Sequence, residues 1–252
     1  VQVEGQEGTG NDTGFRMLTV PNDVTRASLE DDLVFSTGAG SSSILQTFPG
    51  GDASGDDWVD VTASGTTIAR GQGFILYFFD DATDPVGASG LQLDVPDSAV
   101  DFAQDFTTPA LDVGDEYEVL GNPFDEDFDL GALGPANLSG TTLGDAGFNN
   151  TVAVWDPTTG QYELLTQGDP GDTVPAFNAF VVQRTSVGSG DTELTFAADG
   201  RTGSTSPPIG TEVPSGSIMD AAPAPTSKST RESTSETVRI VELQMEATDG
   251  AT

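Results

Sequence analysis

The chain has 252 residues, with 41 acidic and 8 basic side chains, no histidine and no cysteine, and a formal net charge of −33. Without cysteine and histidine it has no disulfides, no thiolate metal sites and no catalytic triad that depends on histidine. The charge has the wrong sign for nucleic acid, whose phosphates are neutralised by Lys and Arg, and no apolar run approaches the ~20 residues of a membrane span.

Composition favours an all-β protein. Gly (31 residues) and Pro (15 residues) indicate many turns, and the short apolar runs between them are rich in Val, Thr and Phe. Dispersed acidic residues are typical of proteins adapted to high salt, where repulsion between charges is screened within about 3 Å at ~1 M. An ordinary acidic secreted protein and a Ca²⁺-binding protein are the other interpretations.

In chain order, residues 1–13 form an N-terminal tail or strand, and residues 14–106 a first β unit. That unit begins with a strand at 14–21, continues with a short helical turn at 27–33 that Ser28 would cap, and has a hairpin at 43–62. Its central strand lies within 66–80, where the longest apolar run (Phe74–Phe79) follows two glycines. A run this short and aromatic predicts a strand buried on both faces.

Residues 107–201 repeat this pattern. Tyr117, Leu120 and Pro123 each follow Phe15, Leu18 and Pro21 by 102 residues, and 172–184 resembles the central strand. A hairpin with the turn sequence DPTTG at 156–160 places Trp155 in the position of Phe48 and Tyr162 in that of Trp58. Since no linker separates the halves, we expect one antiparallel β-sandwich built from two tandem pseudo-repeats.

The C-terminal part differs in composition. Residues 202–236 are rich in Ser, Thr, Pro, Gly and Ala and predict a flexible linker, and residues 237–252 predict a C-terminal strand. Val241, Leu243 and Met245 share one face of this strand, and Val238 and Ile240 the other. Such a strand pairs within its own fold, begins a further domain, or inserts into a neighbouring subunit. Because the chain begins at Val1, we expect a processed protein or a piece of a longer one.

Few residues suggest chemistry. Asp125, Asp127 and Asp129 have the alternate spacing of carboxylates in a Ca²⁺ loop, but Gly131 comes one position late and Ala136 stands where an EF-hand has Glu. A Ca²⁺ site and a solvated acidic surface are the two interpretations, and no other cofactor is expected. Four aromatic residues have two interpretations as well, a sugar-stacking platform or core packing: Trp58, Tyr117, Trp155 and Tyr162.

Three segments carry a family resemblance: YEVLGNP at 117–123, VAVWDPTTGQY at 152–162 and, less closely, PAFNAFVV at 175–182. They resemble the β-rich tail region of large surface proteins exported by the Bacteroidota-type (type IX) secretion system. The resemblance implies an extracellular or cell-surface location and a β-sandwich. It implies no active site, because these motifs contain no catalytic residues.

Together these features predict a non-enzymatic extracellular structural protein, a subunit of a surface filament or layer assembled through β-strand addition in high salt. Its expected partners are further copies of itself or neighbouring surface-protein domains, with no nucleic acid and no membrane insertion. The assembly strand would be formed by Val238, Ile240, Val241, Leu243 and Met245. The alternative is an adhesive or carbohydrate-binding β-sandwich domain of a larger secreted surface protein.

Overall fold

The computed structural model describes residues 2–3, 15–29, 44–51, 58–77, 91–92, 100–157 and 159–206. The strands that precede residue 100 are β1 (Gln2–Val3), β2 (Phe15–Leu18), β3 (Val24–Thr25), β4 (Ile44–Thr47), β5 (Val59–Asp60), β6 (Thr67–Ile68), β7 (Phe74–Tyr77) and β8 (Leu91–Gln92). Those that follow it are β9 (Phe106–Thr107), β10 (Tyr117–Gly121), β11 (Phe128–Asp129), β12 (Leu133–Pro135), β13 (Thr151–Asp156), β14 (Gln161–Thr166), β15 (Thr173–Val174), β16 (Ala179–Gln183) and β17 (Leu194–Phe196).

Helix is scarce in the described residues, which are mostly β, as expected. The helical elements there are α1 (Arg26–Leu29) and two 3₁₀ turns, η3 (Leu130–Ala132) and η4 (Ala198–Gly200). The sequence predicts a short helix near α1, but the prediction that Ser28 caps it is wrong. Thr25 precedes α1, and its Oγ1 accepts the Ser28 N–H at 3.3 Å, so Thr25 is the N-cap and Ser28 lies inside the turn.

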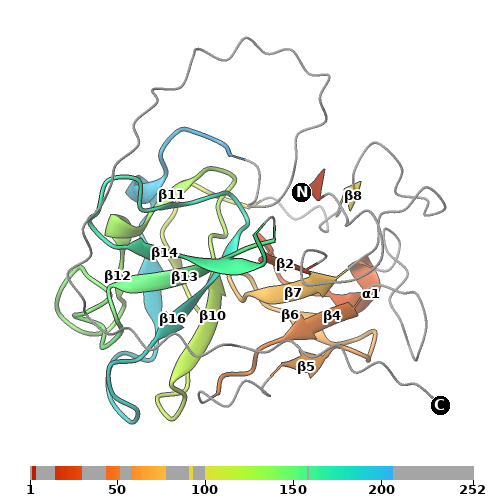
Figure 1. Ribbon diagram of the computed structural model, residues 1–252, viewed down its shortest axis with the longest axis horizontal. Helices are drawn as coiled ribbons and strands as arrows, with labels where there is room; N and C mark the ends of the chain where they lie inside the picture. Colours follow the sequence, from red (N-terminus) through yellow and green to blue (C-terminus); the bar gives the residue numbers. More distant parts are fainter. Residues whose placement is uncertain are drawn as a thin grey trace.

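The first half of the chain forms a four-stranded antiparallel sheet in the order β2-β7-β4-β5, with a separate two-stranded ladder of β3 and β6. Strand β7 occupies an inner position in this sheet, and Phe74, Ile75 and Leu76 are all buried. Burial of consecutive residues means that both faces of β7 are covered, as its continuous apolar run predicts. These strands lie on the right of Figure 1.

The second half forms a sheet in the order β10-β16-β13-β14, with a ladder of β11 and β15. Each strand takes the place that β2, β7, β4 and β5 have in the first sheet, and every pairing is antiparallel in both. The registers agree as well: Phe15 lies opposite Tyr77 in the first sheet, and Tyr117 lies opposite Gln183 in the second. This sheet lies on the left of Figure 1.

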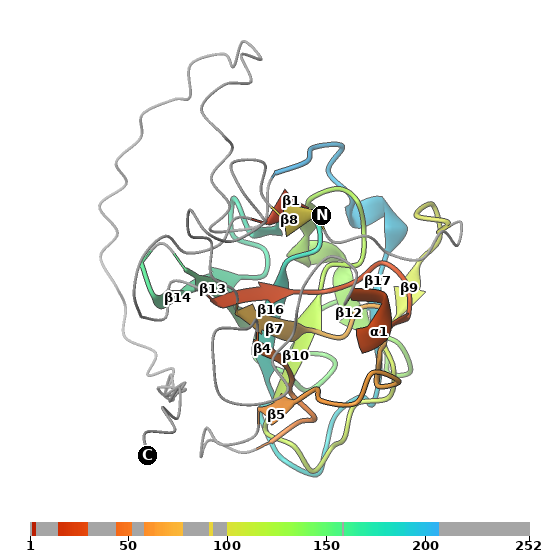
Figure 2. The ribbon, with the colours of Figure 1, turned by 90° about the vertical axis from the view of Figure 1, so that its right-hand side faces the viewer.

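Two further sheets have no such counterpart. β12, β17 and β9 form a three-stranded sheet, whereas β8 pairs with β1, and Figure 2 shows β1 and β8 side by side. The expected equivalence of the closing strands, 91–95 and 193–197, is therefore not seen in their pairing. The expected boundary after residue 106 also falls inside β9, which belongs to the second-half sheets through its pairing with β17.

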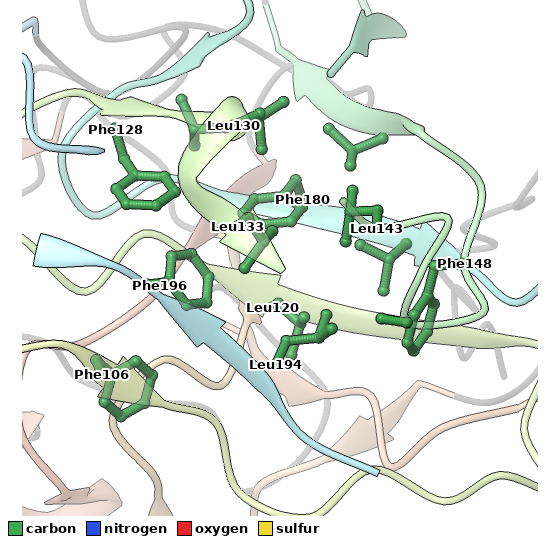
Figure 3. Close-up of a cluster of buried hydrophobic side chains, with 14 of the residues drawn as sticks. Phe106, Leu120, Phe128, Leu130, Leu133, Leu143, Phe148, Phe180, Leu194 and Phe196 are labelled. Carbon is green, nitrogen blue, oxygen red and sulfur yellow. The ribbon is translucent and has the colours of Figure 1, made fainter. Parts of the chain in front are cut away.

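Three clusters of buried side chains alternate with the two large sheets. The first-half core packs on one face of the first sheet and includes Leu18, Leu45, Phe74 and Leu76. The second-half core packs on one face of the second sheet and includes Leu120, Val154, Phe180 and Val182 (Figure 3). Between the sheets, the junction core combines side chains of both halves: Phe15, Met17, Phe48, Ile75, Val119, Trp155, Ala179 and Val181.

Candidate functional site

The acidic segment that suggested calcium has other hydrogen-bonding partners in the structure. Both carboxylate oxygens of the buried Asp127 accept hydrogen bonds from Ser206, its N–H at 2.7 Å and its Oγ at 2.6 Å. The carboxylate of Asp129 caps the turn η3 by accepting the Gly131 N–H at 2.7 Å. Asp125 is exposed.

Among the described residues, no three acidic side chains gather where they could share a metal ion. Binding of Ca²⁺ by Asp125, Asp127 and Asp129 therefore stays a prediction from their spacing alone. In the structure two of these carboxylates hold backbone in place, Asp127 at the segment that follows η4 and Asp129 at the start of η3.

The Asn-Pro pair after β10 has a structural role that the sequence did not reveal. Asn122 is fully buried, and its Nδ2 donates to the carbonyls of Glu126, Val174 and Pro175 at 2.8, 3.1 and 3.1 Å. Its Oδ1 accepts the Phe124 N–H at 3.0 Å. One side chain thus ties the end of β10 to the loop before β11 and to the end of β15.

The aromatic residues of the two hairpins pack in equivalent ways. Trp155 and Tyr162 lie opposite each other in β13 and β14, with ring centroids 5.2 Å apart and planes at 68°. Phe48 and Trp58 in the first half are also 5.2 Å apart, at 61°. Both pairs join the junction core, and Trp155 is only 5 % exposed. Tyr117 also packs against this core.

Trp155 also crosses between the halves. Its Nε1 donates to the Phe15 carbonyl of β2 at 3.1 Å. A platform for sugar rings needs an exposed aromatic face, whereas the indole of Trp155 is buried in the junction core. The hairpin aromatic residues therefore join the two sheets.

Backbone bonds between the halves are reciprocal. Leu18 of β2 forms a bridge with Asn178, which precedes β16, and Leu120 of β10 forms one with Gln72, which precedes β7. In the first bridge the Thr19 N–H donates to the Phe177 carbonyl at 2.9 Å. In the second the Gly121 N–H donates to the Gly71 carbonyl at 3.0 Å. Each half therefore contributes the same two positions to the contact, the end of its first sheet strand (β2 or β10) and the turn before its central strand (β7 or β16).

The turns that enter β7 and β16 share an unusual backbone conformation. Gly71 has φ +72°, and Phe177, in the equivalent place, has φ +59°, the one positive φ of a non-glycine residue in the described part of the chain. A bulky residue rarely adopts this conformation. The first turn requires glycine for a second reason, because a Cβ on Gly71 would lie 2.3 Å from Cε1 of Phe106.

An ionisable pair lies near one end of β10 and β16. Glu118 and Arg184 are 7 % and 3 % exposed. Burial, followed by the charge of Asp115, raises the pKa of Glu118 to about 7 against the opposing effects of Arg184 and a hydrogen bond from the Asp112 backbone. Burial lowers the pKa of Arg184, whose Nη1 donates to the Asp191 carbonyl at 3.0 Å and whose guanidinium lies over the Phe148 ring.

Asp191 organises the loop beside this pair. Its carboxylate accepts the N–H groups of Asn137 and Leu138 at 2.7 and 3.0 Å and the Nδ2 of Asn137 at 2.9 Å. Burial by itself would raise the pKa of Asp191, but these hydrogen bonds and one from the Glu193 backbone outweigh it and lower the pKa to about 2. The carboxylate is thus held ionised as a structural acceptor.

Arginine side chains in the described part are withdrawn from solvent. Arg16, Arg26 and Arg184 are buried, and the other two, Arg70 and Arg201, are half-buried. The guanidinium groups of Arg70 and Arg201 lie over the rings of Phe106 and Phe124, at 4.6 and 5.9 Å from the ring centroids. The exposed charges of this part are consequently carboxylates.

None of the helices in the described residues is long and apolar enough to cross a membrane. In comparisons with known proteins, no family model, no curated protein and no solved structure matched the chain.

Proposed function

We propose that the chain is a non-enzymatic, extracellular structural module adapted to high salt. In this proposal two copies of one antiparallel β unit pack as a sandwich, and the module assembles with further copies of itself through β-strand addition. The observation that carries it is the contact between the two large sheets. There, corresponding residues of the two halves pack in the junction core and form matching backbone bridges.

The internal duplication is supported by three independent correspondences. Strand order and register agree between the two large sheets. The bridges Leu18–Asn178 and Leu120–Gln72 join corresponding positions, since Leu18 corresponds to Leu120 and Gln72 to Asn178. The hairpin aromatic pairs have the same separation and similar angles. Chance similarity of apolar runs explains none of the three, because pairing and packing involve residues far apart in the sequence.

A structural role is supported by what the motif residues do. Trp155 and Tyr162 pack in the junction core, and Asn122 joins two loops to the end of β10. These residues belong to the segments that resemble type IX secreted surface proteins. The contacts of these residues stabilise the fold. This fits a module that acts through its surface rather than through a reactive site.

Adaptation to salt is supported by the distribution of charge. The arginines of the described part are turned inward, and most of its carboxylates remain at the surface. Such a surface repels itself at low ionic strength and is stabilised when salt screens it.

The proposal is tested by negative-stain electron microscopy and sizing of the protein in high salt, with and without residues 237–252. We expect filaments or large assemblies that disappear on truncation, because the C-terminal segment is the expected donated strand. A monodisperse monomer in both preparations would overturn assembly and leave the adhesive domain of a larger surface protein as the function. The sugar-binding version of that alternative is disfavoured by the burial of Trp155.

A further inference from the structure

We propose that the outer edge of β14 is the acceptor for strand addition, and that it receives residues 237–247 from a neighbouring copy of the chain. This inference rests on the proposed function and names the two surfaces that would meet.

The edge is set by the sheet order. β14 is the last strand of the second-half sheet, and in the described part of the chain its six residues pair with β13 alone. The opposite edge of that sheet is β10, which Gly51 and Gln72 of the first half already bridge. The first-half sheet ends in β5, which has only two residues. Among the described strands β14 is thus the longest at a sheet edge, and it lies at the margin of the strands in Figure 2.

Backbone direction makes this edge competent for pairing. The Gln167 N–H donates to the Asn150 carbonyl at 2.8 Å, which continues the β13–β14 ladder by one residue pair. Because the backbone groups of an antiparallel strand alternate in direction, those of Tyr162 and Leu164 point away from β13, whereas the carbonyl of Thr166 already accepts the Asp169 N–H at 3.0 Å. The groups of Tyr162 and Leu164 form a row of donors and acceptors that an added strand can use.

The edge strand is apolar on the face that looks toward the junction core. Leu164 is 41 % exposed and lies on the same face as Tyr162, which packs against the junction core. The other face carries the exposed side chains of Gln161 and Glu163, and Leu165 there packs against the second-half core. An incoming strand with apolar residues on the first face and a basic residue opposite Glu163 would extend the junction core and pair the charge.

Residues 237–247 offer such a strand, with Val238 and Ile240 on one face and Arg239, Val241, Leu243 and Met245 on the other. In an antiparallel alignment that places Arg239 opposite Glu163, Val238 lies opposite Leu164, Ile240 opposite Tyr162 and Val241 opposite Gln161. The alignment therefore matches apolar residues on the face of the junction core and a basic with an acidic residue on the other face, and the residues after Val241 extend past β14. Residues 237–247 lie outside the described residues, so this alignment is derived from sequence and from the geometry of β14.

The tether permits donation to a neighbour. Thirty residues, 207–236, separate the described part from the predicted strand. A flexible chain of this length has a root-mean-square span of about 30 Å. Because the acceptor edge and the donated strand are different surfaces of the same chain, the contact is head-to-tail and propagates unless a ring closes.

The test uses paired cysteines in the full chain, which has none of its own. Glu163 would occupy a non-hydrogen-bonded position toward the added strand, where Cα atoms are about 4.5 Å apart, within the range for a disulfide. We expect Glu163→Cys with Arg239→Cys to give a ladder of disulfide-linked oligomers on non-reducing gels. The control pairs Arg239→Cys with Gln104→Cys, at an exposed position outside β14, and should give no ladder.

A second variant, Leu164→Pro, removes one outward N–H while leaving the pairing with β13 in place. It should abolish the assemblies and keep the circular dichroism of the folded protein, whereas Leu164→Ala keeps the N–H and should still assemble. A cross-link confined to single chains would overturn donation to a neighbour. Assemblies that need residues 237–252 but give no 163–239 cross-link would overturn β14 as the acceptor and leave strand addition itself standing.

Discussion

In the second half, buried polar side chains form hydrogen bonds with backbone groups of loops, which are not paired within the sheets. Asn122 and Asp191 each bond two or more backbone groups in loops, and Asp127 bonds the backbone N–H and the hydroxyl of Ser206. Buried polar groups are costly unless they are hydrogen-bonded, so these three residues are expected to stabilise their loops. The buried side chain of Glu118 differs from them in one respect, because its Oε1 has no hydrogen-bond partner in the described part of the chain.

Glu118 should make stability fall as the pH rises. Burial raises its pKa from 4.5 to about 7 in the folded chain, so the folded state holds a proton that the unfolded state has released between these values. The free energy of unfolding therefore decreases across this window, by about 3 kcal/mol in total, and stays lower above it. We expect Glu118→Gln to be more stable than the wild type at about pH 8 and similar to it at about pH 4.5, measured by urea unfolding.

The control for this prediction is the exposed residue Glu163. The stability difference between Glu163→Gln and the wild type should stay nearly constant over the same pH range. If Glu118→Gln behaves in the same way, burial does not perturb Glu118 and the assigned pKa is wrong.

At the scale of elements, the contact between the halves is reciprocal but not symmetric in residue type. Thr19 and Gly121 are equivalent residues that meet at the junction, and a Cβ on Gly121 would lie 2.3 Å from Cβ of Thr19. Gly73 and Ala179 are equivalent in the same sense, and a Cβ on Gly73 would lie 3.1 Å from Cβ of Ala179. In each pair one half supplies glycine where the other has a side chain, which allows the two backbones to approach.

An exchange of residues between equivalent positions tests this arrangement. Gly121→Thr alone should destabilise the protein by about 2 kcal/mol or more, because two side chains would occupy one space. Thr19→Gly alone should cost about 1 kcal/mol, since it removes packing and the bond from Thr19 Oγ1 to the Gln72 carbonyl at 2.9 Å.

The double variant, Thr19→Gly with Gly121→Thr, should recover most of both losses. The threonine and the glycine would then have exchanged halves, and one side chain would again face one glycine in the equivalent geometry. Thermal unfolding of the four proteins gives the coupling between the two sites. Additive losses would show that the two positions do not face each other as equivalents.

At the scale of the whole molecule, charge separates into an interior and a surface component. Five arginines in the described part are buried or half-buried, several against aromatic rings or backbone carbonyls, whereas most carboxylates face solvent. Inward arginines leave few cations at the surface of the described part to pair with its acids. The net charge of −33 therefore acts mainly as repulsion between surface carboxylates.

The melting temperature should rise with salt. Between about 0.1 M and about 1 M NaCl the screening length falls from about 10 to about 3 Å. We expect the melting temperature, measured by calorimetry, to increase by about 5 °C or more over this range. A variant with Asp125→Asn, Glu163→Gln and Asp199→Asn, three exposed positions, should show a smaller rise. A melting temperature that is flat or falls with NaCl would contradict adaptation to salt.

The sequence predicts the strands better than it predicts how they pair or what the acidic residues contact. The β class, the buried strand β7 and the hairpin of β13 and β14 were predictable, because apolar runs and turn residues act over short distances. The closing strands were not, since β8 and β17 find different partners. The spacing of Asp125, Asp127 and Asp129 predicts a metal loop but does not contain the directions of the side chains. It therefore did not reveal that Asp127 accepts hydrogen bonds from Ser206 and that Asp129 accepts one from Gly131.

The sequence by itself determined local matters: which segments are extended, where the turns lie, and that the surface is acidic. These follow from residue type, because propensity, turn geometry and charge are properties of neighbouring residues. Only the tertiary structure decided that Trp155 reaches Phe15, that Thr19 and Gly121 meet, and that Glu118 and Arg184 are both buried. The first two depend on how two sheets more than a hundred residues apart in the chain pack, and the third on how the strands of one sheet are covered. In each case the contact is set by the shapes of both partners together.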